Sequence, residues 1–345
     1  MMKGGHENTL VEVRNLKKHF RLANKKNLHA VDGVSFSIHE KETLGVVGES
    51  GCGKSTVGNL LIGLLPPKSG EIYVEGNNIW AGGKVDRNKY CHIMQMIFQD
   101  PYTSLNPQKT VRQILSEAYL VHGMKKGKAL NDRISDLIGL TGIEDYVLSR
   151  FPHELDGGKR QLVGIARAIS MNAKFIICDE PVSALDVSIQ ATIINLLMDI
   201  QKRMGLSYLF ISHDLSVVRH ISNRIAVMYL GQIVEMSESE AIFQNTLHPY
   251  SVALLSAVPK IEFDQVSKRI VLEGDVPSPI EPKPGCRFAP RCWMAKDFCK
   301  DNDPELRELQ PGHFVACHFA ETTRQEIAQH TNAPSGKAPG LRIIP

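Results

Sequence analysis

The stretch TLGVVGESGCGKSTVGNLLIGLL, residues 43–65, decides the fold of this chain. It opens with a short apolar run typical of a buried strand and passes through a glycine-rich turn with the spacing GxxxxGK[ST]. It continues as a helical pattern that ends at Pro66 and Pro67. Glycines let main-chain N–H groups wrap a phosphate without Cβ clashes, and the helix N-terminus adds partial positive charge. The motif in this setting predicts a nucleoside triphosphate site; a glycine-rich turn without a ligand is the alternative.

The polar residues of this turn have separate expected roles. Lys54 reaches the β- and γ-phosphates of ATP, and the Ser55 hydroxyl binds Mg²⁺. Cys52 occupies a variable position of the motif and is interpreted as a small filler rather than a nucleophile. The residues expected to bind the nucleotide here are Gly48, Glu49, Ser50, Gly51, Cys52, Gly53, Lys54, Ser55 and Thr56.

The second motif is acidic and reads FIICDE at residues 175–180. Its Asp179 lies 125 residues after Lys54. Four apolar residues before two acids predict a buried strand that delivers carboxylates to the C-terminal edge of an α/β sheet, where ligands bind. We expect Asp179 to hold Mg²⁺ and Glu180 to polarise the attacking water. Glu180 alone could instead cap the next helix, but this alternative explains the acidic pair poorly.

Strand and helix patterns alternate along most of the chain, which predicts an α/β fold with a mostly parallel sheet. Helical periodicity dominates from about residue 108 to 170. Strand patterns return in KFIICDEP and SYLFISHD, and prolines become dense after about Leu247. These changes predict a helical insertion within the α/β core and a small C-terminal addition.

Further motifs give the sequence a strong resemblance to the ATP-binding-cassette (ABC) family. By this resemblance Gln99 in MIFQDP is the Q-loop glutamine, which also contacts Mg²⁺, and Asp186 in SALD belongs to the D-loop at a dimer interface. His213 in FISHD resembles the switch histidine near the γ-phosphate. Phe20, 28 residues before Gly48, matches the aromatic residue that stacks on adenine. The order and spacing of these motifs make coincidence a poor explanation.

A narrower resemblance points to the ATPase subunits of bacterial dipeptide and oligopeptide importers, a group that includes nickel importers. The residues that carry it are FQDPYTSLNP (98–107), DEPVSALDVSIQ (179–190), LHPYSVALLSAVP (247–259) and GCRFAPRC (285–292). It implies an ATPase that works with a second homologous ATPase subunit and two transmembrane permease subunits, and indirectly with a solute-binding protein. Its expected place is the cytoplasmic face of the bacterial inner membrane.

The resemblance also implies a division of the chain into domains. Residues 1–245 are expected to form a P-loop NTPase (RecA-like) cassette, with its core at 1–100 and about 163–245 and a helical subdomain at about 101–162. Residues 246–330 are expected to form a small cysteine-rich domain. Residues 331–340 are small and polar, which predicts a flexible tail at 331–345. The helical subdomain is expected to dock on the permease.

One segment departs from the family pattern. The signature usually reads LSGGQ, but residues 155–159 read LDGGK, with Asp156 before Gly157 and Gly158. In the family dimer the serine donates to the γ-phosphate bound by the opposite subunit, whereas an ionised aspartate cannot donate. Two unit charges about 4 Å apart repel by roughly 4 kcal/mol at an effective dielectric near 20. Aspartate remains a good N-cap, and Lys159 offsets part of its charge. We expect an asymmetric heterodimer in which the partner's nucleotide site, closed by Asp156, is the weak one.

Four cysteines, Cys286, Cys292, Cys299 and Cys317, cluster near the C-terminus with five, six and seventeen residues between them. Four thiolates can hold Zn²⁺ or an iron–sulfur cluster, and this spacing does not separate the two. The family resemblance favours [4Fe–4S] over zinc, and buried free thiols are a third possibility. His313 and His318 flank the last cysteine and are expected to be surface histidines rather than ligands.

Composition sets broader limits. The formal net charge is +3 with both signs interleaved, so we expect no nucleic-acid partner. The first residues, MMKGGHENTLVEV, contain no apolar stretch of a secretory signal, and no apolar run reaches the roughly 18–20 residues of a membrane span. The rival is a soluble ABC ATPase that acts on nucleic acid or the ribosome. Nickel import is a second alternative, because the sequence does not name the solute.

Overall fold

The computed structural model describes residues 9–257, 269–272, 274–323 and 341–344. Its main sheet has the strand order β12-β13-β10-β9-β3-β8-β7-β6. From β9 through β3, β8 and β7 to β6, each strand pairs in parallel with the next. From β9 through β10 and β13 to β12, each strand pairs antiparallel with the next. The strands are β3 (Thr43–Val47), β6 (Met94–Ile97), β7 (Phe175–Asp179), β8 (Ser207–Ile211), β9 (Arg224–Tyr229), β10 (Gln232–Glu238), β12 (Arg307–Gln310) and β13 (His313–Val315). The expected parallel sheet is therefore found at its centre, within a mixed sheet.

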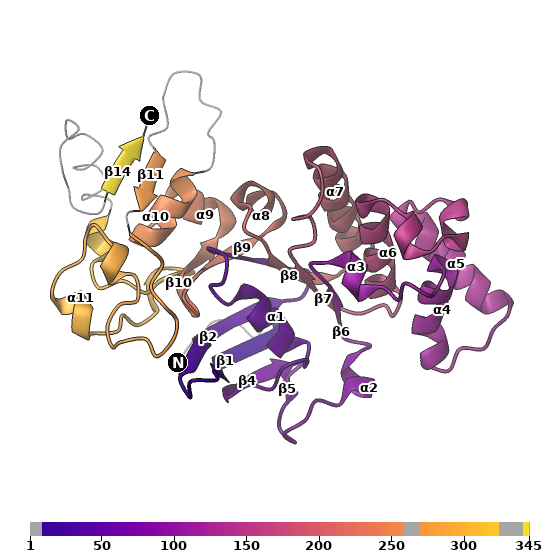
Figure 1. Ribbon diagram of the computed structural model, residues 1–345, viewed down its shortest axis with the longest axis horizontal. Helices are drawn as coiled ribbons and strands as arrows, with labels where there is room; N and C mark the ends of the chain where they lie inside the picture. Colours follow the sequence, from indigo (N-terminus) through magenta and orange to yellow (C-terminus); the bar gives the residue numbers. More distant parts are fainter. Residues whose placement is uncertain (1–8, 258–268, 273, 324–340, 345) are drawn as a thin grey trace.

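A second, antiparallel sheet lies below the main one in Figure 1. Its order is β2-β1-β4-β5, from β1 (Thr9–Arg21), β2 (Asn27–His39), β4 (Ser69–Val74) and β5 (Asn77–Asn78). Helix α1 (Lys54–Leu61) lies between the two sheets, where Leu60 and Leu61 are fully buried in one apolar cluster with strand residues of both. Because each buried leucine contributes roughly 1.5–3 kcal/mol, this packing fixes the helix that follows the glycine-rich turn.

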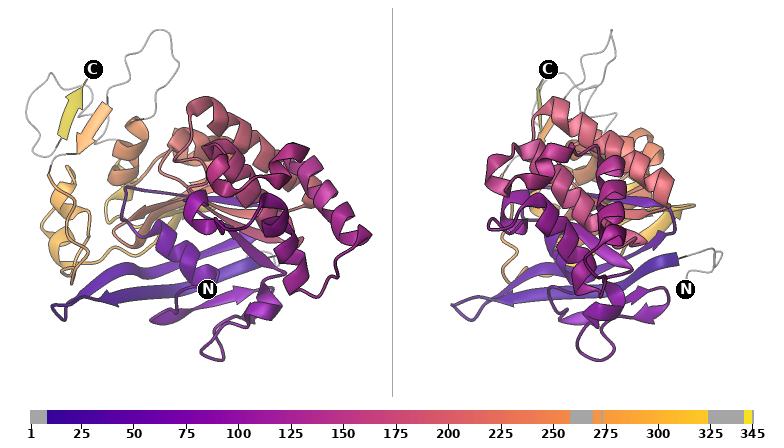
Figure 2. Two further views of the ribbon diagram at one scale, coloured as in Figure 1. Left: turned by 45° about the vertical axis from the view of Figure 1, so that its right-hand side comes forward. Right: turned by 90° about the vertical axis from the view of Figure 1, so that its right-hand side faces the viewer.

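Helices form an arm at the side of the core that is opposite to the C-terminal segment (Figure 2). The arm contains α3 (Pro101–Ser104), α4 (Val111–Val121), α5 (Lys128–Thr141) and α6 (Gly157–Ile169). Helix α4 begins at a capping box in which Thr110 accepts from the Gln113 N–H and the Gln113 side chain accepts from the Thr110 N–H. Helix α5 ends at Gly142, whose φ of 70° suits glycine. These signals separate the arm into short packed helices.

The remaining helices cover the sheets and the C-terminal side. They are α2 (Arg87–Tyr90), α7 (Val187–Met204), α8 (Leu215–Ile221), α9 (Ser239–Gln244), α10 (Pro249–Ser256) and α11 (Phe298–Asp301). Strands β12 and β13 join the main sheet beside β10, so the expected boundary near residue 246 separates segments that share one sheet.

The sequence predicts a flexible tail at 331–345, and the structure describes four of its residues as a strand. Residues 331–340 and 345 lie outside the described residues. Leu341–Ile344 form β14, which pairs antiparallel with β11 (Arg269–Leu272). The main-chain groups of this short segment are therefore satisfied by a partner strand, which the polar composition of the preceding residues did not reveal.

Candidate functional site

The glycine-rich turn connects β3 to α1, as the motif predicts. Gly48 and Gly53 have φ values of 154° and 109°. A Cβ at Gly48 would lie 2.2 Å from the Met228 carbonyl oxygen, and one at Gly53 would lie 2.1 Å from the Ala30 carbonyl oxygen. Only glycine fits this close approach of main chains. No side chain caps the N-terminus of α1, so its first N–H groups remain available to an anion.

Lys54 begins α1 and is buried. Its ammonium group donates to the carbonyl oxygens of Gly48 at 2.8 Å and Glu49 at 3.1 Å. The lysine therefore lies folded back along the turn, where its charge is next to the main-chain amides. A bound phosphate offers this ammonium group a stronger, charged acceptor than a carbonyl oxygen.

Ser55 and Asp179 meet although 124 residues separate them. The Ser55 hydroxyl donates to Oδ1 of Asp179 at 2.8 Å. Burial raises the pKa of Asp179, and the neighbouring charge of Glu180 acts in the same direction. A hydroxyl and a carboxylate that converge in this way are hard oxygen donors of the kind Mg²⁺ prefers. The two residues therefore fit the magnesium role expected from the sequence.

Glu180 lies at the centre of the expected catalytic group. One carboxylate oxygen, Oε2, accepts from Nε2 of Gln99 at 3.0 Å and lies 3.3 Å from Nδ1 of His213. The backbone of Glu180 has a φ of 45°, and its N–H donates to the Ile211 carbonyl at 2.9 Å. His213 is 57% exposed, whereas Glu180 is 14% exposed. The structure thus brings two residues from other loops, Gln99 and His213, to the Glu180 carboxylate, which solvent can still reach.

Phe20 lies near the end of the β1–β2 hairpin, where it pairs with Leu28. The ammonium group of Lys18 lies 5.3 Å from the centre of its ring. Ala30, two residues beyond Leu28, is the residue whose carbonyl approaches Gly53. The hairpin therefore lies beside the phosphate turn, and adenine stacking on Phe20 stays a prediction.

The signature segment begins α6, with Asp156 as its N-cap. Oδ1 of Asp156 accepts from the Lys159 N–H at 2.8 Å, and Oδ2 lies 3.5 Å from the Lys159 ammonium. The hydrogen bond from the Lys159 N–H lowers the pKa of Asp156, so the carboxylate stays ionised at neutral pH. A Cβ on Gly157 would lie 3.2 Å from Leu185 of the D-loop. Asp186 caps α7 without a side-chain hydrogen bond and is exposed.

Two residues at the turn were missed by sequence reasoning. Arg291 forms a two-point ion pair with Glu49, with Nη1–Oε2 at 2.8 Å and Nη2–Oε1 at 3.1 Å. The Glu49 N–H donates to the Tyr250 hydroxyl at 2.9 Å. Both partners come from the C-terminal part of the chain, more than 200 residues from Glu49. Arg291 lies in GCRFAPRC, a segment that carries the family resemblance and two of the cysteines, but no local signal in it pairs Arg291 with the turn.

The four cysteines of the C-terminal segment line one small cavity of about 20 Å³. Phe288, Met294 and Phe319 add apolar walls. Burial raises the pKa of the Cys317 thiol to about 11 and raises those of Cys286 and Cys292. All seven cysteines of the chain are free.

One main-chain N–H group is bonded to a sulfur atom of this cavity, since the Phe319 N–H donates to Sγ of Cys317 at 3.4 Å. Burial raises the pKa of the Cys286 thiol, and the nearby N–H groups of Phe288 and Ala289 act in the opposite direction. Such N–H···S bonds stabilise thiolate charge and are typical around metal-bound sulfur. The expectation of a surface His313 is wrong, because this side chain is buried and its Nε2 lies 2.8 Å from Oε1 of Glu235.

Within the part of the chain that the structure describes, none of the helices combines the length and apolarity needed to cross a bilayer.

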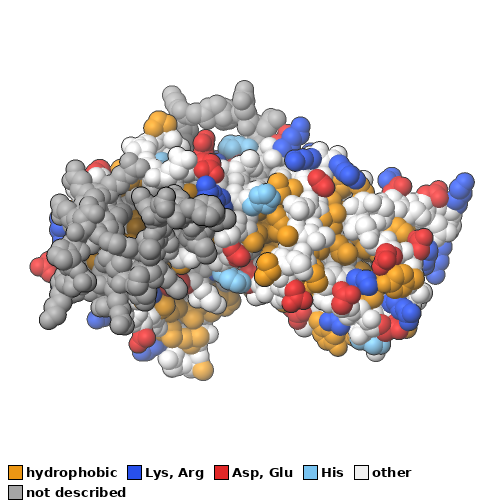
Figure 3. All heavy atoms as spheres, turned by 90° about the horizontal axis from the view of Figure 1, so that it is seen from above, with side chains coloured by type: hydrophobic (Ala, Val, Ile, Leu, Met, Phe, Trp, Pro, Cys, Tyr) orange, Lys and Arg blue, Asp and Glu red, His pale blue; other side chains and the backbone are white. Residues whose placement is uncertain are grey.

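Basic and acidic side chains alternate over the face of the helical arm seen in Figure 3.

Comparison with known proteins identifies the family. A family model described as "ABC transporter" matches residues 31–183, and one described as "Oligopeptide/dipeptide transporter, C-terminal region" matches residues 234–299. The chain is 48% identical over 313 residues to the putative oligopeptide transport ATP-binding protein YkfD of Bacillus subtilis, which covers 90% of this chain and 95% of that protein. It is 43% identical over 317 residues to the dipeptide transport ATP-binding protein DppF of Haemophilus influenzae, with 90% and 97% covered.

Solved structures agree with this assignment. The ATP-binding cassette MJ0796, in a dimeric post-hydrolysis state bound to ADP and Pi, matches with a TM-score of 0.60 and 25% identity over 67% of this chain and 99% of that one. CbiO1 of Clostridium perfringens, part of the ABC transporter complex cbiONQ, matches with a TM-score of 0.60 and 26% identity over 72% and 94%. The chain therefore belongs to the ABC transporter ATPases, which couple ATP hydrolysis to transport, and within them to the oligopeptide and dipeptide transport ATP-binding proteins.

Proposed function

We propose that this chain is the ATP-hydrolysing subunit of a bacterial importer for dipeptides or oligopeptides. The observation that carries the proposal is the meeting of Gln99 and His213 on one oxygen of Glu180, next in the chain to the Asp179 that binds Ser55. The names of the relatives, which specify oligopeptide and dipeptide transport, support peptides as the solute.

In this proposal the residues of one half-site divide the work of phosphoryl transfer. Main-chain amides of the turn and Lys54 bind the β- and γ-phosphates, and Ser55 and Asp179 hold Mg²⁺, which neutralises phosphate charge. Glu180 accepts a hydrogen bond from the attacking water and polarises it. His213 orients the Glu180 carboxylate and, being exposed, can also reach a nucleotide phosphate at the subunit interface.

Replacing Glu180 with Gln tests this assignment. The amide keeps the size of the side chain but is a far weaker base, so hydrolysis should fall by at least about 100-fold while ATP affinity is retained. Glu117→Gln, an exposed position on α4, is the matched control and should hydrolyse ATP normally. Rapid turnover by Glu180→Gln would remove this residue from its proposed role.

The proposed partners are a second ATPase subunit and two permease subunits, which hold the chain at the cytoplasmic face of the membrane. A groove of about 310 Å³ between the core and α6 supports this arrangement, because its walls are mostly apolar. They include Ile62, Leu64, Tyr90 and Phe98, with Arg167 of α6 as a charged residue among them. We expect a cytoplasmic helix of the permease to bind here. Leu64→Arg should weaken co-purification with the two membrane subunits without changing ATP affinity, and unchanged assembly would contradict the assignment.

We further propose that the working dimer is asymmetric. This chain's own Lys54, Glu180 and His213 fit a hydrolytic site, whereas its signature carries Asp156 where a hydroxyl donor is usual. The Asp156 side chain is 59% exposed and near Lys159, so solvent and the ammonium group reduce its repulsion of a phosphate. The segment still lacks a hydroxyl that could donate to the phosphate. In addition, the carboxylate already accepts from the Lys159 N–H at the positive end of α6.

Asp156→Ser in the assembled complex tests the asymmetry. Serine also caps helices, so α6 should persist while the partner's site gains a donor and hydrolyses faster. Asp132→Ser, at an exposed position on α5, is the control for loss of one surface charge. Site-specific turnover that is equal in wild type and Asp156→Ser would refute the idea. The purified homodimer of this chain should hydrolyse ATP poorly.

We propose a [4Fe–4S] cluster for the four-cysteine cavity, with zinc as the alternative. All four thiols line one cavity, so the same four residues could hold either group. The resemblance to the peptide-importer ATPases favours the cluster over zinc. The cluster would have a structural role here, because it crosslinks four points of a loop-rich segment.

Anaerobic purification followed by iron, zinc and sulfide analysis separates the candidates. We expect about four iron atoms and four sulfides per chain, with an absorbance band that Cys292→Ser abolishes. One zinc per chain without iron would overturn the proposal in favour of zinc, and a folded metal-free protein would overturn both.

A further inference from the structure

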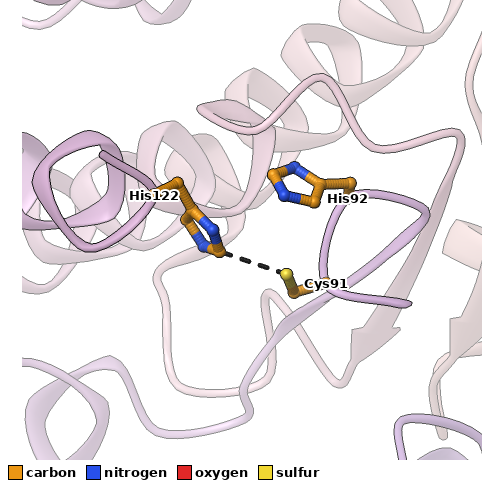
Figure 4. Close-up of side chains that lie close together, drawn as sticks. All are labelled: Cys91, His92 and His122. Carbon is orange, nitrogen blue, oxygen red and sulfur yellow. Dashed lines mark hydrogen bonds between the residues drawn. The ribbon is translucent and has the colours of Figure 1, made fainter. Parts of the chain in front are cut away.

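Three metal-binding side chains meet outside the nucleotide site. Cys91 and His92 follow α2 in the turn before β6, and His122 lies at the C-terminal end of α4. Their donor atoms, one sulfur and two imidazole nitrogens, all lie within 4.8 Å of one another. Figure 4 shows the three side chains around a common space, with Sγ of Cys91 3.8 Å from Nε2 of His122.

The geometry is close to that of a tetrahedral metal site. Zinc bonds of about 2.3 Å to sulfur and about 2.05 Å to nitrogen place these two atoms about 3.6 Å apart. The observed separation of 3.8 Å between Cys91 and His122 therefore needs little adjustment. One thiolate and two imidazoles suit borderline-soft ions such as Zn²⁺, whereas Mg²⁺ and Ca²⁺ prefer oxygen. Three protein ligands leave one position open to water.

The surroundings hold the donors in place and favour a cation. The Gln95 amide donates to the Cys91 carbonyl at 2.7 Å, and the Cys91 thiol donates to the Asn88 carbonyl at 3.3 Å. His122 is at the C-terminus of an 11-residue helix, whose dipole attracts positive charge. The carboxylate of Asp86 is close enough to act on the Cys91 thiol. The site is half-exposed, so an ion can enter from solvent.

A second cluster of similar donors, His19, His29 and Asp32, does not support the same inference. Asp32 already pairs with Arg287 and lies 3.6 Å from the Lys17 ammonium. Its negative charge is therefore compensated by side chains of the protein.

The Cys91 cluster also joins two parts of the molecule. Cys91 and His92 precede β6, which leads directly to Gln99, whereas His122 belongs to the helical arm. We propose that Cys91, His92 and His122 bind a zinc-like divalent transition-metal ion, which ties the end of α4 to the strand that leads to Gln99. Metal occupancy then restrains motion of the helical arm relative to the residue that contacts Glu180.

Zinc titration of the full-length chain, with its four-cysteine site first loaded anaerobically, tests the site. Free Zn²⁺ is set by a chromophoric chelator. Wild type should bind one additional zinc that His122→Ala and Cys91→Ser bind at least about 100-fold more weakly. His220→Ala, an exposed histidine on α8, is the matched control and should bind zinc as wild type does. Both test variants keep the four C-terminal cysteines, so those residues cannot account for a difference.

Spectroscopy and hydrogen exchange give independent readouts. Co²⁺ in the site should show a thiolate charge-transfer band that Cys91→Ser abolishes. Zn²⁺ should slow amide exchange over residues 111–121 in wild type and not in His122→Ala. Equal zinc affinity in wild type and both variants would refute the site. Zinc binding without slower exchange would refute the restraint on the helical arm.

Discussion

The ion pair between Arg291 and Glu49 gives the sharpest test of how the C-terminal segment supports the nucleotide turn. Arg291 is 7% exposed and Glu49 is 29% exposed. Removing one partner of a buried pair costs about 3–5 kcal/mol, because the remaining charge is left uncompensated. Glu49 can regain some water, so we expect Arg291→Met to lower the free energy of unfolding by a smaller amount, about 2 kcal/mol.

The same change should also weaken ATP binding. Glu49 would keep its negative charge within the phosphate turn after its guanidinium partner is lost, and like charges repel. We expect about a tenfold loss of ATP affinity, which corresponds to about 1.4 kcal/mol. Glu49→Gln combined with Arg291→Met removes the uncompensated charge and should recover most of both losses.

The assays are denaturant unfolding and equilibrium binding of a fluorescent ATP analogue, with Mg²⁺ present in the binding assay. Iron content is measured alongside, because Arg291 is next to Cys292 and the variant must retain its metal site. Arg14→Met breaks the exposed Arg14–Glu12 pair and serves as the control, which should change little. If Arg291→Met behaves like Arg14→Met in both assays, the reasoning is wrong.

Three further predictions concern stability and the turn. Burial lowers the pKa of His248 from 6.5 to about 3. The contribution of neutral His248 to stability is therefore present above about pH 6.5 and is lost on acidification. In His248→Asn, the free energy of unfolding measured with urea should change less between pH 7.5 and pH 5 than in wild type. Leu61→Ala should cost 2–5 kcal/mol by urea unfolding, with an unchanged m-value. Gly53→Ala should abolish ATP-analogue binding, because its Cβ would lie 2.1 Å from the Ala30 carbonyl oxygen.

Local motifs explain why so much of the nucleotide site could be predicted. The turn at Gly48–Ser55 is fixed by neighbours in sequence, since a strand, a turn with three glycines and a helix follow one another directly. Asp179 and Glu180 also follow their strand directly, and parallel pairing brings strand ends together. The meeting of Ser55 with Asp179 at 2.8 Å thus follows from two local patterns and one topological rule.

Contacts between distant segments could not be predicted in this way. Arg291 and Glu49 are 242 residues apart, and neither has a neighbouring pattern that names the other. His313 follows a proline and glycine, which suggests a surface turn, yet it begins β13 and is buried against Glu235. The hydrophobic pattern of a three-residue strand is too short to reveal that it joins the main sheet.

Asp156 shows that the requirements of folding and of catalysis can be separated at one residue. An N-cap needs a side-chain oxygen that accepts from the helix, and the carboxylate meets this need at 2.8 Å with a charge that suits the helix dipole. Phosphate recognition needs a hydrogen that the same oxygen cannot supply while ionised. Because the Lys159 N–H lowers the pKa of this carboxylate, mild acidification cannot restore the donor. Serine at this position would supply both functions. Under the proposed asymmetry, the aspartate would therefore alter catalysis at the partner's site and leave the formation of α6 intact.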